Sequence, residues 1–261
     1  MTTDGRSEAR LRVTPLPSIV AGELFDEIAN NPVGVSVSYY NRFVYVVDQE
    51  PVPNAMVLGF SQNATTGALT PVPGTTITVS GGKTVAMGYA AGVVPSAIAE
   101  EPTSRFVYVT DQASNQLIGY TAAASGALVA MVNGPFTTGL FPANLTIDPT
   151  GKLIYVVNYN ASSVQGYMID TTTGTPSGAA GGSTGFTTPT GTGPTCVGVD
   201  PALGTFLFTS DSLDNTVTGE HLNPNTGGLT AVQNSPFPAS GTPVCVVAVA
   251  NGSHASQSIA P

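Results

Sequence analysis

The sequence predicts an all-β protein built from repeated antiparallel sheets, and three observations support this class. Charged residues make up only 9% of the 261 residues, while Gly (30) and Pro (21) are frequent. Such a composition favours strands and turns over helices. A short apolar phrase also recurs along the chain, as NRFVYVVDQ at 41–49, SRFVYVTDQ at 104–112, GKLIYVVNY at 151–159 and GTFLFTSDS at 204–212.

Length and charge limit the classes of function. A hydrophobic content of 41% over 261 residues is enough to form one large domain or two small ones. The formal net charge of −9, with seven Lys and Arg, leaves too few cations to bind nucleic acid or an anionic membrane surface. Residues 1–12 carry charges without the apolar core of a signal peptide. We therefore expect a soluble, cytoplasmic protein, or an extracellular or periplasmic one if a leader precedes this sequence.

The repeats align on a proline that precedes an alternating strand. These prolines are Pro32, Pro95, Pro142, Pro194 and Pro243. The aligned units then carry, in order, the recurring apolar phrase, a Gly-aromatic pair and a Thr-Gly or Ser-Gly turn such as TGAL at 66–69. Turn residues separate these segments, so each unit is predicted to form four antiparallel strands.

Four-stranded sheets repeated around an axis are typical of a β-propeller. The predicted blades cover about 32–94, 95–141, 142–193 and 194–242, with a partial fifth blade at 243–249. Residues 1–31 are expected to hold an outer strand of another partial blade, and 250–261 form a tail. The first unit is long because of residues 75–94, which are expected to add a hairpin over the mouth of the propeller.

The first strand of each unit carries small residues at its crowded inner positions. Two residues after the prolines stand Gly34, Ala97, Asn144, Cys196 and Cys245. Equivalent positions in neighbouring blades are expected to lie beyond the Cα separation of about 7 Å that a disulfide allows. The two cysteines are therefore expected to be buried free thiols. No second Cys or His cluster supports a metal site, and no cofactor is expected.

The phrases RFVYVVDQ, KLIYVVNYN, DPTGK, TGALTPV and NSPF resemble the YVTN-type propellers of the lactonase group. This group includes 6-phosphogluconolactonase-like and carboxymuconate cycloisomerase-like proteins, and the resemblance runs from about Pro32 to Val249. It implies a seven-bladed ring, whereas the sequence holds four complete units. The chain then forms either a small closed ring or an open arc or fragment. We favour the arc, whose exposed edges predict self-association.

Polar residues recur where the second strand of each unit ends, on one rim of the predicted propeller. They are Asp48, Asp111, Asn158 and Asp211. Such side chains stabilise turns by accepting hydrogen bonds from the backbone two residues on. They are also the residue types that line a mouth able to hold a cation or activate water. Their recurrence in every unit favours the turn interpretation.

Rim residues that do not recur are the better functional candidates, because repetition itself indicates a structural role. The candidate catalytic bases are the non-recurring Glu50 and Asp214, together with Asp111 from the recurring set. The candidate ligand-binding residues are Asn115, Asn144, Tyr159 and Asn160. For Asn144, near the axis, the alternative is a buried amide with its hydrogen bonds satisfied.

Two functional hypotheses remain. Lactone hydrolysis needs a general base and donors for the oxyanion, and the resemblance implies a His, Arg and Glu set near the mouth. His221 and His254 are the only histidines and neither is expected there, so no catalytic residue is transferred. The first hypothesis is a hydrolase of a small neutral lactone or sugar-like ligand, since an acidic rim disfavours a phosphorylated one. The second is a non-catalytic propeller whose rim binds a glycan, a peptide or a protein.

Overall fold

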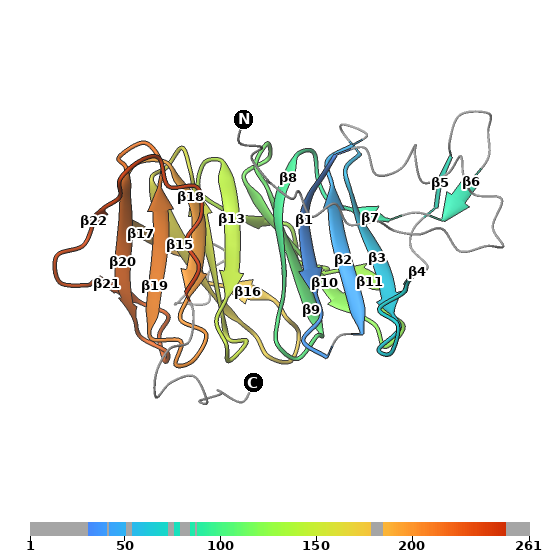
Figure 1. Cartoon of the computed structure of the whole chain (residues 1–261). Helices are drawn as coiled ribbons and strands as arrows, with labels where there is room; N and C mark the ends of the chain where they lie inside the picture. The colour runs from blue at the N-terminus through green and yellow to red at the C-terminus, as the bar shows by residue number, and fades with distance from the viewer. Residues whose placement is uncertain are drawn as a thin grey trace, which may run out of the picture.

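A computed structural model describes residues 31–40, 42–50, 54–72, 76–78, 84–86, 88–178 and 185–248 of the chain. All regular elements in these residues are strands, which confirms the predicted all-β class. They form four sheets, the blades of a partial propeller, and one separate hairpin (Figure 1). The described part contains no helix of the length and apolarity that a membrane span requires.

Each blade has four antiparallel strands in chain order, and a further short strand pairs with the third strand beside the fourth. Blade 1 contains β1 (Pro32–Val37), β2 (Phe43–Asp48), β3 (Met56–Gln62), β4 (Leu69–Pro71) and β7 (Tyr89–Ala90). Blade 2 contains β8 (Pro95–Glu100), β9 (Phe106–Asp111), β10 (Gln116–Ala122), β11 (Leu128–Ala130) and β12 (Phe136–Thr137). Blade 3 contains β13 (Pro142–Ile147), β14 (Leu153–Asn158), β15 (Ser163–Ile169), β16 (Pro176–Ser177) and β17 (Phe186–Pro189). Blade 4 contains β18 (Pro194–Val199), β19 (Phe206–Asp211), β20 (Thr216–Leu222), β21 (Leu229–Ala231) and β22 (Phe237–Pro238).

The repeated proline begins the innermost strand of every blade. In all four blades the register with the second strand shifts directly after this proline, as between Pro95 and Ala97. Proline has no N–H to donate to a ladder, so it suits the first residue of a strand and a bulge. The proline therefore defines where each blade starts, at the end of the blade where the second strand finishes.

The polar residue six positions after each proline closes the turn from first to second strand. The hydroxyl of Ser38 accepts hydrogen bonds from the N–H groups of Arg42 (2.8 Å) and Phe43 (2.9 Å). In blade 3 a carboxylate oxygen of Asp148 accepts the N–H groups of Lys152 (2.8 Å) and Leu153 (2.7 Å). These side chains satisfy backbone donors that the turn leaves unpaired, so their recurrence is structural.

Adjacent blades are joined by the same hydrogen bond three times. A tyrosine hydroxyl in the second strand donates to the carbonyl of the glycine that turns from third to fourth strand in the next blade. The pairs are Tyr45 with Gly126 (2.9 Å), Tyr108 with Gly174 (2.6 Å) and Tyr155 with Gly227 (2.8 Å). Each glycine has positive φ, and a Cβ on Gly126 would lie 2.4 Å from the ring of Phe43. Only glycine permits both this conformation and this close approach.

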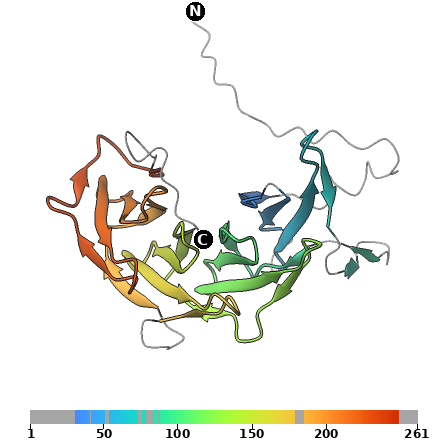
Figure 2. The ribbon, with the colours of Figure 1, turned by 90° about the horizontal axis from the view of Figure 1, so that it is seen from below.

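The four blades lie along an open arc, as Figure 2 shows. At one end Val35 is 62% exposed, whereas its equivalents Ile98, Leu145 and Val197 are buried against the preceding blade. At the other end Phe206 is 39% exposed, whereas its equivalent Phe106 is buried. The described residues therefore favour the arc over a small closed ring, and both ends present apolar surface that internal blades cover.

The expectation of free thiols is wrong, because Cys196 and Cys245 form a disulfide with a Cα–Cα distance of 4.8 Å. Residues 243–248 lie beside β18, and the hydroxyl of Thr195 donates to the carbonyl of Val244 at 2.8 Å. Innermost strands converge near the axis more closely than the 7 Å that we assumed. A Cβ on Gly34, for example, would lie only 3.7 Å from the Cα of Ala97 in the next blade.

The added hairpin in the first unit is present but does not cover the mouth. It consists of β5 (Thr76–Thr78) and β6 (Thr84–Ala86), which pair with each other alone. Figures 1 and 2 both place it at the outer side of blade 1, beyond β4 and β7. An insertion between the fourth strand and the outer strand β7 starts at the periphery of a blade, so it extends outwards.

Candidate functional site

The recurring rim residues are buried inside turns. Asp48, Asp111, Asn158 and Asp211 end the second strands of the four blades and are at most 1% exposed. Asp48 accepts the N–H groups of Asn31 (3.1 Å) and Glu50 (3.0 Å). These contacts support the turn interpretation rather than a carboxylate-lined mouth.

Asp111 illustrates why these carboxylates are poor bases. It accepts the N–H groups of Val93 (2.9 Å), Val94 (3.0 Å) and Ala113 (3.2 Å). Burial alone would raise the pKa of Asp111, but these hydrogen bonds to the charged form outweigh it and hold the pKa below its ordinary value. The side chain fixes the connection into blade 2 and has no free direction toward a substrate.

Asp211 is also a poor candidate base, although its environment differs from that of Asp111. One carboxylate oxygen accepts the hydroxyl (2.6 Å) and the N–H (3.0 Å) of Thr218, and the other accepts the hydroxyl of Thr209 (2.8 Å). Burial raises the pKa of this carboxyl, although the hydrogen bonds act in the opposite direction. The group is enclosed between β19 and β20 and does not reach the rim surface.

The two non-recurring acidic candidates, Glu50 and Asp214, are exposed but far apart along the arc. Glu50 follows β2 in blade 1, whereas Asp214 lies in the β19–β20 turn of blade 4. A carboxylate oxygen of Asp214 accepts the N–H of Thr192 at 2.5 Å. The three predicted bases thus come from three different blades and do not form one catalytic group.

The polar candidates for ligand binding divide into two sets. Asn115, Tyr159 and Asn160 lie in the β9–β10 and β14–β15 turns, beside the connection that enters blade 3. The amide oxygen of Asn115 accepts the N–H of Phe141 at 2.7 Å, and Tyr159 donates its N–H to the carbonyl of Phe141 at 2.9 Å. Asn144 is half-buried on β13 and lies apart from this set.

The sequence did not point to three apolar residues beside this set, Leu140, Phe141 and Leu213, which form a patch together with the predicted Tyr159. We define the rim patch as Leu140, Phe141, Tyr159 and Leu213. Leu140 and Leu213 are 58% and 60% exposed, and Phe141 is 38% exposed. The rings of Phe141 and Tyr159 lie 6.0 Å apart at 56°. One signal was available in the sequence, because Phe141 precedes Pro142 where blade 4 has Gly193 before Pro194.

The rim patch is continuous across blades 3 and 4. A Cβ on Gly193 would lie 2.7 Å from Leu213 Cγ and 3.1 Å from Tyr159 Cε2, so both side chains close over this glycine. Asn160 donates its N–H to the carbonyl of Leu140 at 3.2 Å, and Leu213 donates to that of Thr192 at 3.1 Å. Backbone hydrogen bonds therefore fix every segment that supplies the patch.

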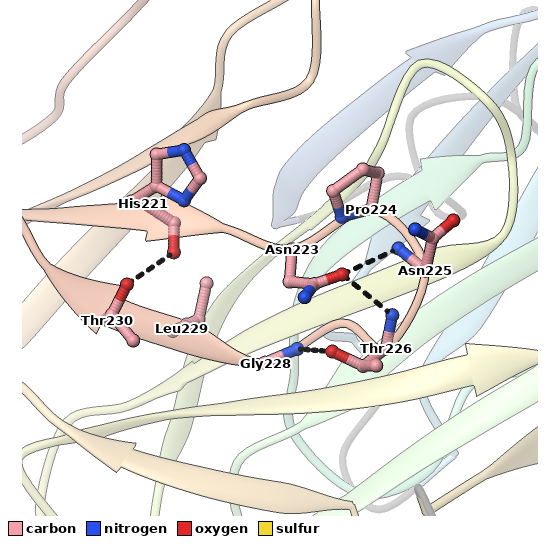
Figure 3. A pocket seen from close by; sticks show the side chains of 8 residues that line it. All are labelled: His221, Asn223, Pro224, Asn225, Thr226, Gly228, Leu229 and Thr230. Carbon is pink, nitrogen blue, oxygen red and sulfur yellow. Dashed lines mark hydrogen bonds between the residues drawn. The ribbon is translucent and has the colours of Figure 1, made fainter.

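A shallow depression on blade 4 is a turn rather than a binding site. It is lined by His221, Asn223, Pro224, Asn225, Thr226, Gly228, Leu229 and Thr230 (Figure 3). The Asn223 side chain accepts the N–H groups of Asn225 (3.0 Å) and Thr226 (3.3 Å). Asn63 makes the equivalent hydrogen bonds in blade 1, so the polar groups of this turn stabilise a turn that recurs between blades.

The described cationic residues all lie at one end of the blades, whereas acidic residues lie at both ends. The described Lys and Arg residues are Arg42, Arg105 and Lys152, in the turns from first to second strand, opposite the rim. Arg42 and Arg105 lie over the rings of Phe43 and Phe106, at 5.3 and 4.9 Å from their centroids. Among the described residues no group of three His, Cys, Asp or Glu could hold a metal ion.

This fold, with four-stranded blades repeated around an axis, is that of a β-propeller. A family model described as lactonase, 7-bladed β-propeller, matches residues 38–182, more than half of the chain. The chain therefore belongs to this family. None of the curated proteins matches the sequence.

Solved structures share the fold at low sequence identity. A functionally unknown protein from Desulfotomaculum acetoxidans is 17% identical with a TM-score of 0.57, over 77% of this chain and 55% of that one. Hydrazine synthase from Kuenenia stuttgartiensis is 18% identical with a TM-score of 0.51, over 77% and 48%. A periplasmic gluconolactonase from Pseudomonas aeruginosa is 15% identical over 83% and 72%, with a TM-score of 0.46 that supports no inference. This chain thus covers about half the length of the first two, and the likeness shows the fold alone.

Proposed function

We propose that this lactonase-family propeller binds a partner protein through its rim and does not itself hydrolyse a lactone. One observation carries the proposal: the recurring rim carboxylates are buried and accept hydrogen bonds inside turns. Asp111, the predicted base with the most contacts, accepts three backbone N–H groups and has a lowered pKa. A general base needs a free direction toward its proton and a pKa near the working pH.

The alternative is hydrolysis of a small neutral lactone, and membership of the lactonase family favours it. Of the predicted bases, only Glu50 and Asp214 have exposed side chains. No described His or Arg lies beside either residue to stabilise an oxyanion, since Arg42 and Arg105 lie at the opposite end and His221 on β20.

A lactone panel tests the two functions. Proton release from γ-butyrolactone, δ-valerolactone and glucono-δ-lactone is followed with the wild type and with the variants Glu50→Gln, Asp111→Asn and Asp214→Asn. We expect wild-type turnover to equal the buffer rate. Turnover that one variant abolishes, with an unchanged melting transition, would establish the hydrolase and reject the proposal.

The disulfide supports a compartment for this function. Disulfides persist in oxidising environments and are rare in the cytosol. The pair Cys196–Cys245 therefore supports an extracellular or periplasmic location over the cytoplasmic one. Mass spectrometry after alkylation without reduction tests this, because two modified cysteines in protein from its native source would contradict it.

A further inference from the structure

Phe141 has a backbone conformation that its side chain disfavours. Its φ is +58°, in the left-handed region that a bulky residue rarely adopts, and it also precedes a proline. The equivalent residue of blade 4 is Gly193, with a φ of +67°. Glycine adopts this conformation without strain, so the same connection can be built without an aromatic residue.

Packing does not explain why an aromatic residue is present at this position. The side chain of Phe141 is 38% exposed, and among the described residues its ring partner is Tyr159, at 6.0 Å between ring centroids. Neighbours impose the strained backbone, since Asn115 accepts the Phe141 N–H and Tyr159 donates to the Phe141 carbonyl. Strained residues of this kind cluster at sites of function, where the surrounding structure holds them in place.

The rim patch has the composition of a binding surface. Aromatic residues are enriched where protein partners bind. Contiguous exposed apolar patches mark such sites, whereas scattered single apolar residues do not. Leu140 and Leu213 extend the aromatic pair on its two sides, while Asn160 and Asp214 are exposed polar neighbours in the same turns. The four apolar side chains are held by three backbone connections from two blades, which gives the patch a defined shape.

Charge specifies the kind of partner. All described Lys and Arg residues lie at the end of the blades opposite the rim, and the exposed charged residues of the described rim are Glu50 and Asp214. A cation over the face of Tyr or Phe is attracted by the ring, and a nearby carboxylate adds to the attraction. The described rim therefore complements a cationic group and repels an anionic one.

We infer that the rim patch binds a peptide segment of a partner protein, in which an Arg or Lys stacks on the Phe141–Tyr159 pair beside an apolar side chain that contacts Leu140 or Leu213. This site deepens the proposed function and rests on it. The guanidinium group suits the role best, because it is planar and weakly hydrated and it stacks on aromatic rings.

Labelled hexapeptides in which Leu alternates with Arg, Gln or Glu provide the probes, and their binding is measured by fluorescence anisotropy at low and high salt. We expect the Arg peptide to bind at least tenfold more tightly than the Glu peptide, with the Gln peptide between them. Cellohexaose serves as a carbohydrate competitor. Equal affinity for the three peptides, or displacement of the Arg peptide by cellohexaose, would overturn the inference.

The variant Phe141→Gly separates binding from folding. It keeps the left-handed conformation that Gly193 shows to be compatible with this connection, so we expect the melting temperature to stay unchanged or rise while peptide affinity falls at least tenfold. The matched control is Tyr40→Ala in the exposed Tyr39–Tyr40 pair, whose rings lie 5.4 Å apart in the turn at the opposite end of blade 1. Full affinity in Phe141→Gly would overturn the inference.

The two proposals fail in different ways. Lactone turnover that Glu50→Gln abolishes would reject the proposed function, whatever the peptides do. Absence of turnover together with absence of Arg-peptide binding would reject the rim patch as a peptide site and leave the non-catalytic assignment standing.

Discussion

Glu100 is a half-buried acid, with enclosed carboxylate oxygens, at a position where the other blades carry apolar residues. Its equivalents are Val37, Ile147 and Val199. Both carboxylate oxygens are buried, and the Ser104 hydroxyl near them makes no hydrogen bond of standard geometry to either. Burial raises the pKa of Glu100 to about 7; the hydroxyl of Ser104 lowers it less than burial raises it. We predict that Glu100→Gln stabilises the protein at neutral and alkaline pH.

The size of the stability gain in Glu100→Gln follows from the pKa shift of Glu100. A rise of the pKa from 4.5 to about 7 corresponds to at most about 3.4 kcal/mol, since one pKa unit equals about 1.36 kcal/mol. Partial solvent contact reduces this, so we expect a gain of about 1–2 kcal/mol in the free energy of unfolding at pH 8. A raised folded-state pKa means that the wild type is most stable below the unfolded value and loses stability as the pH rises toward the folded value. The gain should therefore fall to roughly a quarter at pH 5.

Urea unfolding followed by far-UV circular dichroism measures this, because the chain has no Trp for fluorescence. The wild type and Glu100→Gln are compared at pH 5, 6.5 and 8. The exposed Glu50 supplies the control, because Glu50→Gln makes the same substitution at the surface and should change the free energy of unfolding by less than about 0.5 kcal/mol. A Glu100→Gln gain that is absent at pH 8, or equally large at pH 5, would refute the reasoning.

Three further predictions concern the blade junctions and ends. Tyr108→Phe leaves the Gly174 carbonyl without its donor and should lower the free energy of unfolding by about 1–2 kcal/mol in urea titrations; an unchanged midpoint would mean that the bond contributes nothing. Cys245→Ser removes a cross-link of sequence separation 49, so we expect the free energy of unfolding to fall by up to about 4 kcal/mol. Thermolysin should then cleave the segment 243–248 faster, as measured by mass spectrometry. Val35→Glu places a charge on the exposed end of the arc and should abolish concentration-dependent self-association, measured by light scattering. A wild-type protein that stays monomeric at all concentrations would contradict this expectation.

The fold could be predicted because each blade repeats the same local sequence pattern. A proline without an N–H starts the inner strand, a Ser, Asp or Glu closes the next turn, and an alternating apolar strand follows. Ser38 and Asp148 perform the same task in blades 1 and 3 with different side chains. Four repetitions distinguish such a pattern from a chance similarity. Each strand and turn of the pattern also depends on residues that are close in sequence.

Distances around the axis could not be predicted in the same way. The separation of Cys196 and Cys245 depends on how neighbouring inner strands pack, and no local pattern encodes this. The direction of the β5–β6 hairpin likewise depends on where its ends leave the blade.

The candidate site was predicted in part. The turn roles of Asp48 and Asp111 follow from their recurrence. Asn115 lies in the β9–β10 turn, and Tyr159 and Asn160 lie in the β14–β15 turn; that these three residues bind a ligand stays a prediction. Phe141 was not singled out because its distinguishing feature is a backbone angle, which the residue type does not reveal. Comparison of aligned units for a bulky residue opposite a glycine would have found it.

The repeated bond between a tyrosine and a turn glycine also bears on how such arcs evolve. A duplicated blade would bring its own tyrosine for the next blade and its own glycine for the previous one, so whole blades can be gained or lost without new contacts. Blade 4 interrupts this series, because Phe208 stands where Tyr45, Tyr108 and Tyr155 carry their hydroxyls. Restoring one oxygen atom at Phe208 would make this end of the arc chemically equivalent to the others, ready to accept a further repeat.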